Sequence, residues 1–515
     1  MATAFRAKEI ATEAHKNQHD KAGQPYILHA ERVSNKGKNP TERICGMLHD
    51  VVEDSSWTFE KLEEEDFEKE IIEVLKLLTR QPHEDYEAFF ARVCTHPVAV
   101  AVKIYDVEDT LDVTRMEQLT EKDMHRINRY LKALRVLKEA EKRHIQAKED
   151  SKEAAYQAQR NFYMGCILGG AIGDALGAPI EFMTMDEIQR TYGKEGVTDY
   201  VEYPDGTGEI TDDTQMTLFT AEGLLRAYHR GRIKGIKGAQ VSLCWHSYLR
   251  WLYTQDGQMP EILKKMDSPA GWLMQHKELF RLRAPGNTCL SSLRTGKMHS
   301  IEEPANNSKG CGTVMRMAPA GLIYAWETAE AFENGAKISA LTHGHPSGYL
   351  SGGVMAALIY GLKERKNLRL AIDESLHELR KWDGHEELLR KINQALELHR
   401  LHQYTDITHR EIEQIGGAWV AEEALAISLL CALHYPNDFE KAVIKAINHS
   451  GDCDSTGAIT GNIIGMLVGE EGIPVRWKQN LRYKHIIEQI AHDLWLQFDG
   501  EIEATREWGE KYPAE

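Results

Sequence analysis

The chain has few features of a secreted, membrane or nucleic-acid-binding protein. Its eight cysteines are scattered without a C-x-x-C pair, which indicates reduced thiols and a cytoplasmic protein. No uncharged run approaches the roughly 20 residues that a membrane-spanning helix needs, and the polar start "MATAFRAKEIATEAHKNQ" is not typical of a signal peptide. Lys and Arg number 62 against 79 Asp and Glu, a net charge of −17. This acidity disfavours general binding to nucleic acid or anionic membranes.

Strand-like alternation is also scarce, whereas helical spacing is common. One apolar stripe has steps of three, four and three residues and consists of Met124, Ile127, Leu131 and Leu134. Residues 68–80, "EKEIIEVLKLLTR", follow a similar pattern. We therefore expect a nearly all-α protein.

The length of 515 residues exceeds the usual size of one hydrophobic core, so we expect two domains. From about residue 138 to 160 the sequence is charged and almost free of large aliphatic side chains. Such a composition is typical of a solvated helix. We place a helical connector at 148–160, between a first domain at 1–147 and a second at 161–515.

Two ladders of glycine recur with a spacing of four residues in the second domain. They consist of Gly165, Gly169, Gly173 and Gly177, and of Gly457, Gly461, Gly465 and Gly469. Each glycine in a helix costs about 1 kcal/mol relative to alanine, so smooth faces of this kind predict backbones in close approach. We expect two central, buried helices. Dimerisation within a membrane is the rival interpretation, but Asp174 and the shortness of the apolar runs count against it.

Imidazoles and carboxylates recur in the first domain. His29 lies in "GQPYILHAERV", His49 and Asp50 lie in "LHDVVED", and Asp106 lies in "VKIYDVEDTLD". Two imidazoles and two carboxylates from separate helices suit a borderline divalent ion such as Mn²⁺, Fe²⁺ or Zn²⁺.

One helical turn beyond the His-Asp pair, Glu53 and Asp54 are placed to orient an attacking water. Taken singly, a His-Asp pair is more often a surface pair, and an acidic run is usually a solvated face. The combination of all these residues favours the metal site.

The first domain resembles the HD-domain hydrolases of the RelA/SpoT type, especially their small stand-alone members. The matching stretches are "AHKNQHDKAGQPYILHAERV", "LHDVVEDSSWTFEKL", "LTRQPHEDYEAFFARV" and "VAVKIYDVEDTLD". The resemblance implies one Mn²⁺ or similar ion and removal of the 3′-pyrophosphate of guanosine alarmones such as ppGpp. It implies that the metal ligands are His29, His49, Asp50 and Asp106. It also implies that Glu53 and Asp54 activate the water and that Lys21 and Lys103 neutralise the phosphates.

Two positions depart from this family. Asp20 precedes Lys21 where the long alarmone enzymes have Arg, and Thr110 stands four residues after Asp106 where they have Asn. In the family these positions help to hold guanine. We therefore expect a weakened guanine preference, which leaves an adenosine alarmone or another nucleotide pyrophosphate open.

Two acidic motifs mark the second domain. "TDDT" begins at Thr211, and "GDCDST" contains Asp452, Asp454 and Ser455. Helix capping is the simplest interpretation of either motif, because Ser, Thr and Asp are favoured at helix starts. A cap needs one acid, however, and each motif supplies two. Their oxygens could hold a pair of Mg²⁺ or Mn²⁺ ions.

The second domain resembles the ADP-ribosylglycohydrolases, which include dinitrogenase-reductase-activating glycohydrolase and the ADP-ribosylhydrolases. The matching stretches are "GCILGGAIGDALGAPIEF", "TDDTQMT", "GCGTVMRMAPAGL", "LTHGHPSGYLSGGVMAALIYG", "GGAWVAEEALAISLLCAL" and "GDCDSTGAITGNIIGML". The resemblance implies two metal ions held by Thr211, Asp212, Asp213, Asp452, Asp454 and Ser455.

The same resemblance implies further roles at the substrate. Asp213 and Glu181 would be catalytic, and Glu181 would close over the distal ribose. The loops that contact diphosphate and ribose would contribute Gly310, Gly312, His343, Gly344 and Tyr349. His343 could equally be a core histidine, and Arg316 could bind phosphate or bridge loops.

Together these features predict a bifunctional cytoplasmic hydrolase that acts on a purine alarmone and on an ADP-ribosylated protein or small molecule. Two alternatives stay open. In one, the first domain senses an alarmone without turnover and regulates the second domain. In the other, the second domain only binds ADP-ribose, which its complete metal motifs disfavour. The sequence does not distinguish arginine, serine, a nucleobase or an acyl group as acceptor, and it predicts no oligomeric state.

Overall fold

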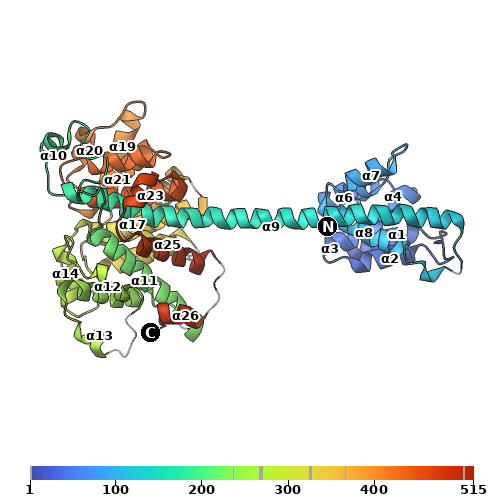
Figure 1. Ribbon diagram of the computed structural model, residues 1–515, viewed down its shortest axis with the longest axis horizontal. Coiled ribbons are helices and arrows are strands. Elements are labelled where there is room, and N and C mark those ends of the chain that lie inside the picture. Colours follow the sequence, from blue (N-terminus) through green and yellow to red (C-terminus); the bar gives the residue numbers. More distant parts are fainter. Residues whose placement is uncertain are drawn as a thin grey trace. The chain divides into compact units, whose positions relative to one another are not determined.

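In the computed structural model, all regular secondary structure of the described residues is helical (Figure 1). The described residues are 3–116, 118–235, 237–265, 271–323, 327–365, 367–500, 502 and 505–514. Within them, extended pairing is limited to three isolated bridges, and no strand is formed. The prediction of an all-α protein is confirmed.

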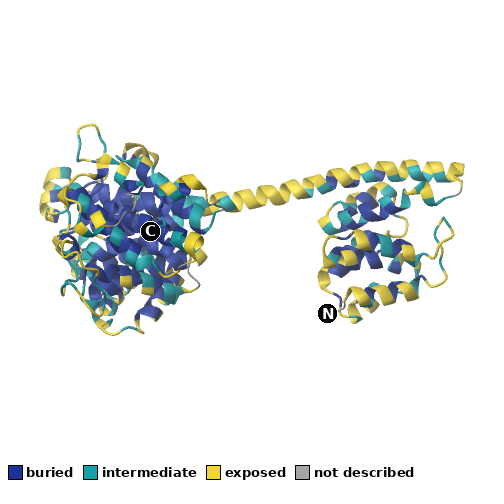
Figure 2. Cartoon of the chain, turned by 90° about the horizontal axis from the view of Figure 1, so that it is seen from below, coloured by how far each residue is buried: buried dark blue, intermediate teal, exposed yellow. Residues whose placement is uncertain are grey.

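The chain divides into two compact units, Met1–Ala155 and Tyr156–Glu515. The division falls inside helix α9 (Glu121–Gly177), within the segment 148–160 that we expected as a connector. Every residue from 145 to 155 is exposed, as Figure 2 shows for the middle of this helix. The charged composition of this stretch therefore matches its solvation.

The first unit packs short helices around one hydrophobic core. These are α1 (Ala4–Ala14), α2 (Ile27–Lys36), α3 (Pro40–Leu48), α4 (Val51–Asp54), α5 (Phe59–Glu64), α6 (Lys69–Leu78), α7 (Tyr86–Val93), α8 (Pro97–Thr110) and the start of α9. Helix α3 begins where Asn39 accepts a hydrogen bond from the amide of Glu42 and Pro40 occupies the first turn. These start signals place α3 so that its C-terminal end carries His49 toward α2 and α8.

The second unit is larger and has its own core. After the 3₁₀ turn η2 (Ala178–Ile180) its helices are α10 (Met185–Tyr192), α11 (Asp212–Lys234), α12 (Gln240–Asp256), α13 (Glu261–Lys265) and α14 (Asn287–Arg294). The 3₁₀ segment η5 (Cys311–Arg316) precedes α15 (Ala318–Leu322), α16 (Thr328–Ala340), α17 (Pro346–Arg365), α18 (Leu368–Leu379), α19 (Glu386–His402) and α20 (His409–Ile415). The unit ends with α21 (Ala421–His434), α22 (Phe439–Ile447), α23 (Cys453–Val468), α24 (Val475–Asn480), α25 (Lys484–Phe498) and α26 (Arg506–Lys511).

The two glycine ladders pack against each other, on α9 and α23. A Cβ at any of the first three ladder glycines of α9 would clash with a backbone carbonyl of α23, in the antiparallel pairs Gly165 with Gly465, Gly169 with Gly461, and Gly173 with Gly457. Gly177 lies in the same way against the carbonyl of Cys453. The prediction of close backbone approach between central helices is confirmed.

By length and composition, α9 with η2 could cross a membrane, but 89% of its apolar window is buried inside the protein. The contact with α23 and the surrounding core account for this burial.

The contact between the glycine ladders predicts that replacing a ladder glycine by alanine destabilises the protein, whereas the same replacement at a solvated helix position stabilises it. At a solvated helix position, Gly→Ala stabilises by about 1 kcal/mol. Gly173→Ala should instead lower the free energy of unfolding by about 1–3 kcal/mol, because its methyl group meets the Gly457 carbonyl. Thermal unfolding measures this, with Ser151→Ala on the exposed part of α9 as the control. An unchanged or raised melting temperature for Gly173→Ala would contradict the packing.

Candidate functional site

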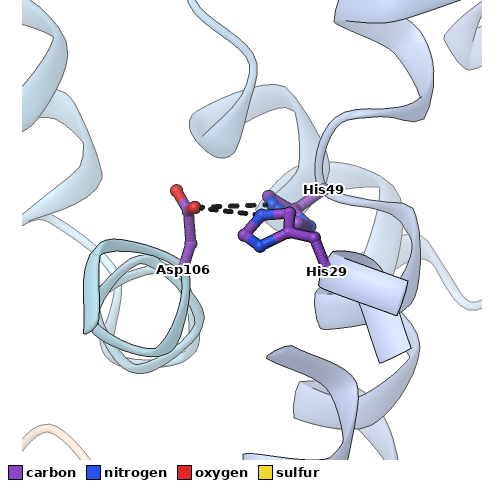
Figure 3. Close-up of side chains that lie close together, drawn as sticks. All are labelled: His29, His49 and Asp106. Carbon is purple, nitrogen blue, oxygen red and sulfur yellow. Dashed lines mark ion pairs between the residues drawn. The ribbon is translucent and has the colours of Figure 1, made fainter. Parts of the chain in front are cut away.

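The first centre gathers side chains from three places in the first unit (Figure 3). His29 lies on α2, His49 at the end of α3 and Asp106 on α8. Asp106 Oδ1 lies 3.3 Å from His29 Nε2 and 3.8 Å from His49 Nε2. Asp50 Oδ2 lies 2.9 Å from His49 Nε2 and 4.0 Å from His29 Nε2. The structure therefore brings together all four residues for which the sequence predicted metal binding.

The protonation of His49 leaves a ring nitrogen facing acids. Its Nδ1 donates a hydrogen bond to the Gly46 carbonyl at 2.8 Å, which fixes the proton on that nitrogen. Its Nε2 is buried and makes no assigned hydrogen bond, but it lies within ion-pair distance of Asp50 and Asp106. A cation placed among Nε2, Asp50 and Asp106 would be bound by the ring nitrogen and by both carboxylates. These residues fit a divalent metal ion.

A supporting layer holds His29. Its Nδ1 lies 2.7 Å from Asp109 Oδ2, and Asp109 in turn accepts hydrogen bonds from Arg32 at 2.7 and 3.0 Å. Burial lowers the pKa of His29, but hydrogen bonds with Asp106 and Asp109 outweigh it and raise the pKa to about 9. A carboxylate behind a metal-binding imidazole is a common orienting partner.

Three supporting residues, Asp109, Arg32 and Tyr26, were not predicted from the sequence. Asp109 could have been found from its spacing, since it lies one helical turn after Asp106. Tyr26, whose hydroxyl donates to Asp50 Oδ2 at 2.5 Å, carries no comparable signal in the sequence.

A cavity of about 310 Å³ opens onto this centre. Glu53 and Asp54 both line it, as do Lys21 and Lys103. The Lys103 ammonium lies 2.7 Å from Asp106 Oδ2. Burial and then the charges of Asp50 and Glu53 raise the pKa of Asp54. The cavity thus combines acids near the predicted metal site with cations suited to an anionic ligand.

The two positions that depart from the resembled family also line this cavity. Asp20 accepts hydrogen bonds from the amides of Ala22 and Gln24, each at 2.9 Å, and it lies 3.7 Å from Arg32 and 3.6 Å from Arg115. Thr110 donates to Asp106 Oδ1 at 3.4 Å. Asp20 is therefore part of the structural charge network around the cavity.

In the second unit, Asp174 of α9 fixes the start of α11. Its fully buried carboxylate accepts hydrogen bonds from the Thr211 amide at 3.0 Å and the Thr211 hydroxyl at 2.8 Å. The Thr214 amide at 3.1 Å and hydroxyl at 2.5 Å complete the set. Sequence analysis used Asp174 only as an argument against a membrane helix. Its position in the ladder helix, before an acidic motif, was the signal for this role.

The six residues for which the sequence predicted binding of two metals lie at the starts of two helices. Thr211, Asp212 and Asp213 begin α11, whereas Asp452, Asp454 and Ser455 begin α23. All six are between 1% and 4% exposed. Thr211 and Asp452 are indeed N-caps, so capping explains one residue of each motif. It leaves three buried carboxylates without a capping role.

The surroundings hold some of these oxygens in place. The Gly286 amide donates to Asp212 Oδ2 at 3.1 Å, and the Cys311 thiol donates to Asp452 Oδ2 at 2.8 Å. Oδ2 of Asp213 is buried without a hydrogen-bond partner. Within the described residues, no three acids of this centre bring ligand atoms within 4.8 Å of one another, as the trio of the first centre does.

Like charges dominate the second centre. Burial, together with repulsion from Asp174 and Asp452, raises the pKa of Asp212 to about 8. Burial and neighbouring acids also raise the pKa values of Asp213 and Asp454 well above their ordinary value. Such a group cannot be fully ionised without compensating cations. Its hard oxygen atoms fit Mg²⁺ or Mn²⁺.

Glu181 lies beyond η2, and burial followed by the charges of Asp452 and Asp212 raises its pKa to about 8. His343 is 1% exposed, and its Nδ1 lies 2.9 Å from the Thr342 hydroxyl. Burial and the charge of Arg316 lower the pKa of His343 to about 3, so its ring is neutral.

The predicted substrate loops surround this histidine. A Cβ at either Gly310 or Gly312 would lie 3.2 Å from the His343 ring, so both glycines allow η5 to pack on it. A Cβ at Gly344 would clash with the Asn306 carbonyl, and Tyr349 is 7% exposed. The loops are thus assembled mainly by backbone contacts around a buried imidazole.

Comparison with known proteins identifies the second unit. A family model described as ADP-ribosylglycohydrolase matches residues 155–503. ADP-ribosyl-[dinitrogen reductase] glycohydrolase of Rhodospirillum rubrum is 26% identical over 329 residues, which cover 62% of this chain and 90% of that protein. ADP-ribosylarginine hydrolase Tri1 of Pseudomonas putida is 23% identical over 337 residues, which cover 64% of this chain and 77% of that protein.

A solved structure of a metazoan ortholog of SpoT that hydrolyzes ppGpp aligns with a TM-score of 0.24 and 19% identity. It covers 27% of this chain and 86% of that chain, and a likeness at this TM-score does not identify a fold. The family model, in contrast, covers more than half of the chain. The chain therefore belongs to the ADP-ribosylglycohydrolase family and is a hydrolase.

Proposed function

We propose that the second unit cleaves ADP-ribose from a modified acceptor, using two Mg²⁺ or Mn²⁺ ions. The observation that carries this proposal is the burial of Asp212, Asp213 and Asp454 at two helix starts, where burial and neighbouring acids raise their pKa values. Uncompensated carboxylates at such positions destabilise a fold, so a site that keeps them is best explained by bound cations.

Each element of the centre has a distinct role in this proposal. Thr211, Asp212, Asp213, Asp452, Asp454 and Ser455 hold the ions, which when bound supply positive charge at the ribose. Asp174 keeps the start of α11 in position through its four hydrogen bonds. Glu181 lies near the acids and acts on the ribose, and the loops carrying Gly310, Gly312, His343, Gly344 and Tyr349 bind the rest of ADP-ribose.

The proposed substrate is an ADP-ribosylated protein or small molecule in the cytoplasm. The names of two relatives support the protein class, because one acts on ADP-ribosylated dinitrogen reductase and the other on ADP-ribosylarginine. In this chain the acceptor can be arginine, serine, a nucleobase or an acyl group.

Removing one acid should separate activity from folding. Asp213→Ala or Asp454→Ala should lower ADP-ribose release at least 100-fold, because the ions lose a ligand. The metal-free variants should melt at or above the wild-type temperature, since each loses a repelling carboxylate. Chromatography of released ADP-ribose and thermal unfolding measure both effects.

Asp186→Ala, an exposed acid on α10, is the control for this experiment. Release by both variants at the wild-type rate would show that the acids do not hold catalytic ions.

We further propose that the first unit hydrolyses the 3′-pyrophosphate of a purine alarmone such as (p)ppGpp or (p)ppApp. This proposal rests on the resemblance of its motifs and on the convergence of His49 Nε2 with the Asp50 and Asp106 carboxylates. One Mn²⁺ or similar ion, held by His29, His49, Asp50 and Asp106, would supply charge at the phosphate when bound. Glu53 and Asp54 position the water, and Lys21 and Lys103 neutralise the phosphates.

The competing proposal makes the first unit an alarmone sensor that regulates ADP-ribose release. Asp20 favours it, since this residue is tied into contacts with Arg32 and Arg115 where the resembled family has a base-binding arginine. Glu53 and Asp54 favour turnover, because both line the cavity as a water-activating pair would.

An assay with ppGpp and ppApp side by side distinguishes these alternatives. We expect pyrophosphate release from both, with ppApp at least as good a substrate, because Asp20 and Thr110 replace residues that hold guanine. Glu53→Gln should reduce release at least 100-fold and serves as the blank. Turnover of ppGpp alone would contradict the relaxed base preference. Tight binding without turnover would favour the sensor.

The two centres should also differ in metal content. Two imidazoles favour a transition ion in the first centre, whereas the all-oxygen second centre accepts Mg²⁺. In the Mn²⁺-loaded full chain, His49→Ala should lose one equivalent of Mn²⁺ by elemental analysis after exchange into Mg²⁺ buffer. His377→Ala, an exposed histidine on α18, should lose none. Equal Mn²⁺ content in the wild-type protein, His49→Ala and His377→Ala would rule out a metal site at the first centre.

A further inference from the structure

An exposed aromatic pair lies beside the second centre. Phe182 and Trp419 stack with ring centroids 5.4 Å apart and planes inclined by 22°. They remain 76% and 45% exposed, although both are large apolar side chains. The stack connects the turn after η2, which carries Glu181, to the loop between α20 and α21.

The turn that carries Glu181 has few other anchors. The Glu181 carboxylate makes no hydrogen bond or ion pair with any residue in the described ranges, whereas its neighbour Phe182 makes the stack. The Met183 amide donates to the Ile180 carbonyl within the turn at 3.0 Å, and the Met185 amide donates to the Ser450 hydroxyl of another segment at 2.9 Å. The stack is therefore positioned to control where Glu181 points.

The loop that carries Trp419 is held to the acidic centre by backbone hydrogen bonds. The Asp452 amide donates to the Gly417 carbonyl at 2.9 Å, and the Cys311 amide donates to the Trp419 carbonyl at 3.4 Å. Between them Ala418 has a φ of +64°, which is unfavourable for a residue with a Cβ. Such backbone strain persists where the surrounding structure enforces it, often at functional sites. Here it presents the Trp419 ring to Phe182.

We propose that the Phe182–Trp419 stack is a clasp that holds the Glu181 turn over the acidic centre. Phe182 and Trp419 are positioning residues in this proposal, because they act through Glu181 and do not touch the reacting atoms. The acids of the centre are at most 4% exposed, and the clasp keeps the Glu181 turn close to Asp452 and Asp212. The proposal rests on the proposed role of Glu181 in ADP-ribose release.

A direct role of Trp419 in substrate binding is the main competing explanation. An exposed indole can stack on a planar group, and its loss would then weaken binding whatever residue stood at position 181. A clasp predicts a different pattern, in which the effect of Trp419 depends on Glu181. Two measurements separate these explanations, one of them independent of any substrate.

The first measurement is hydrogen–deuterium exchange of the full chain with Mg²⁺ present. The amides of Met183, Thr184 and Met185 are hydrogen-bonded in the closed turn, to Ile180, Glu187 and Ser450. Trp419→Ala should speed their exchange about 2- to 13-fold, the range that corresponds to the loss of an aromatic pair. Tyr404→Ala, which removes a 92% exposed aromatic elsewhere, is the matched control.

The second measurement is the kinetics of ADP-ribose release. Trp419→Ala should lower kcat by a similar factor with little change in KM, and Trp419→Phe should restore it by keeping a ring on Phe182. In a Glu181→Gln background, Trp419→Ala should have no further effect on kcat. Phe182→Ala should likewise lower kcat in the wild-type background and have no further effect on kcat in the Glu181→Gln background.

Unchanged exchange in Trp419→Ala would overturn the clasp, as would a rise in KM of equal size in both backgrounds. If the wild-type protein released no ADP-ribose, the proposed function would fail instead. The exchange experiment would still decide whether the stack holds the turn closed.

Discussion

The close contact between α9 and α23 is the constraint on which the second unit depends. The two helices meet backbone to backbone because each presents glycine every fourth residue, in the pairs Gly165–Gly465, Gly169–Gly461 and Gly173–Gly457. This contact places the end of α9, with Asp174, next to the start of α23, with Asp452 and Asp454. Asp174 then fixes the start of α11 through Thr211 and Thr214. A packing feature thus brings two acidic helix starts to one place.

Both centres concentrate acids that the fold leaves incompletely compensated, and they differ in how much the protein itself supplies. In the first unit, Lys103 and His29 provide positive charge next to Asp106. In the second unit, burial and mutual repulsion raise the pKa values of the acids, and Asp213 keeps an unpartnered oxygen. The second centre therefore depends more strongly on external cations than the first.

The helical class and the packing of the ladders could be predicted from the sequence because both depend on periodicity. The grouping of His29, His49, Asp50 and Asp106 followed from motif resemblance, which periodicity alone would not have given. Asp174 and Asp109 had local signals in the sequence, but their partners Thr211 and His29, 37 and 80 positions away, could not be identified from those signals. The Phe182–Trp419 stack could not be predicted either, because it joins segments that no local pattern relates. The roles of the predicted site residues remain predictions.

The central claim is that the buried acids of the second unit form an ADP-ribose site only when they hold divalent ions. Calorimetric titration of ADP-ribose into the metal-depleted and the Mg²⁺-loaded full chain tests this claim most directly. We expect binding to the Mg²⁺-loaded protein and none to the metal-depleted protein. Equal affinity in the two forms would contradict this claim.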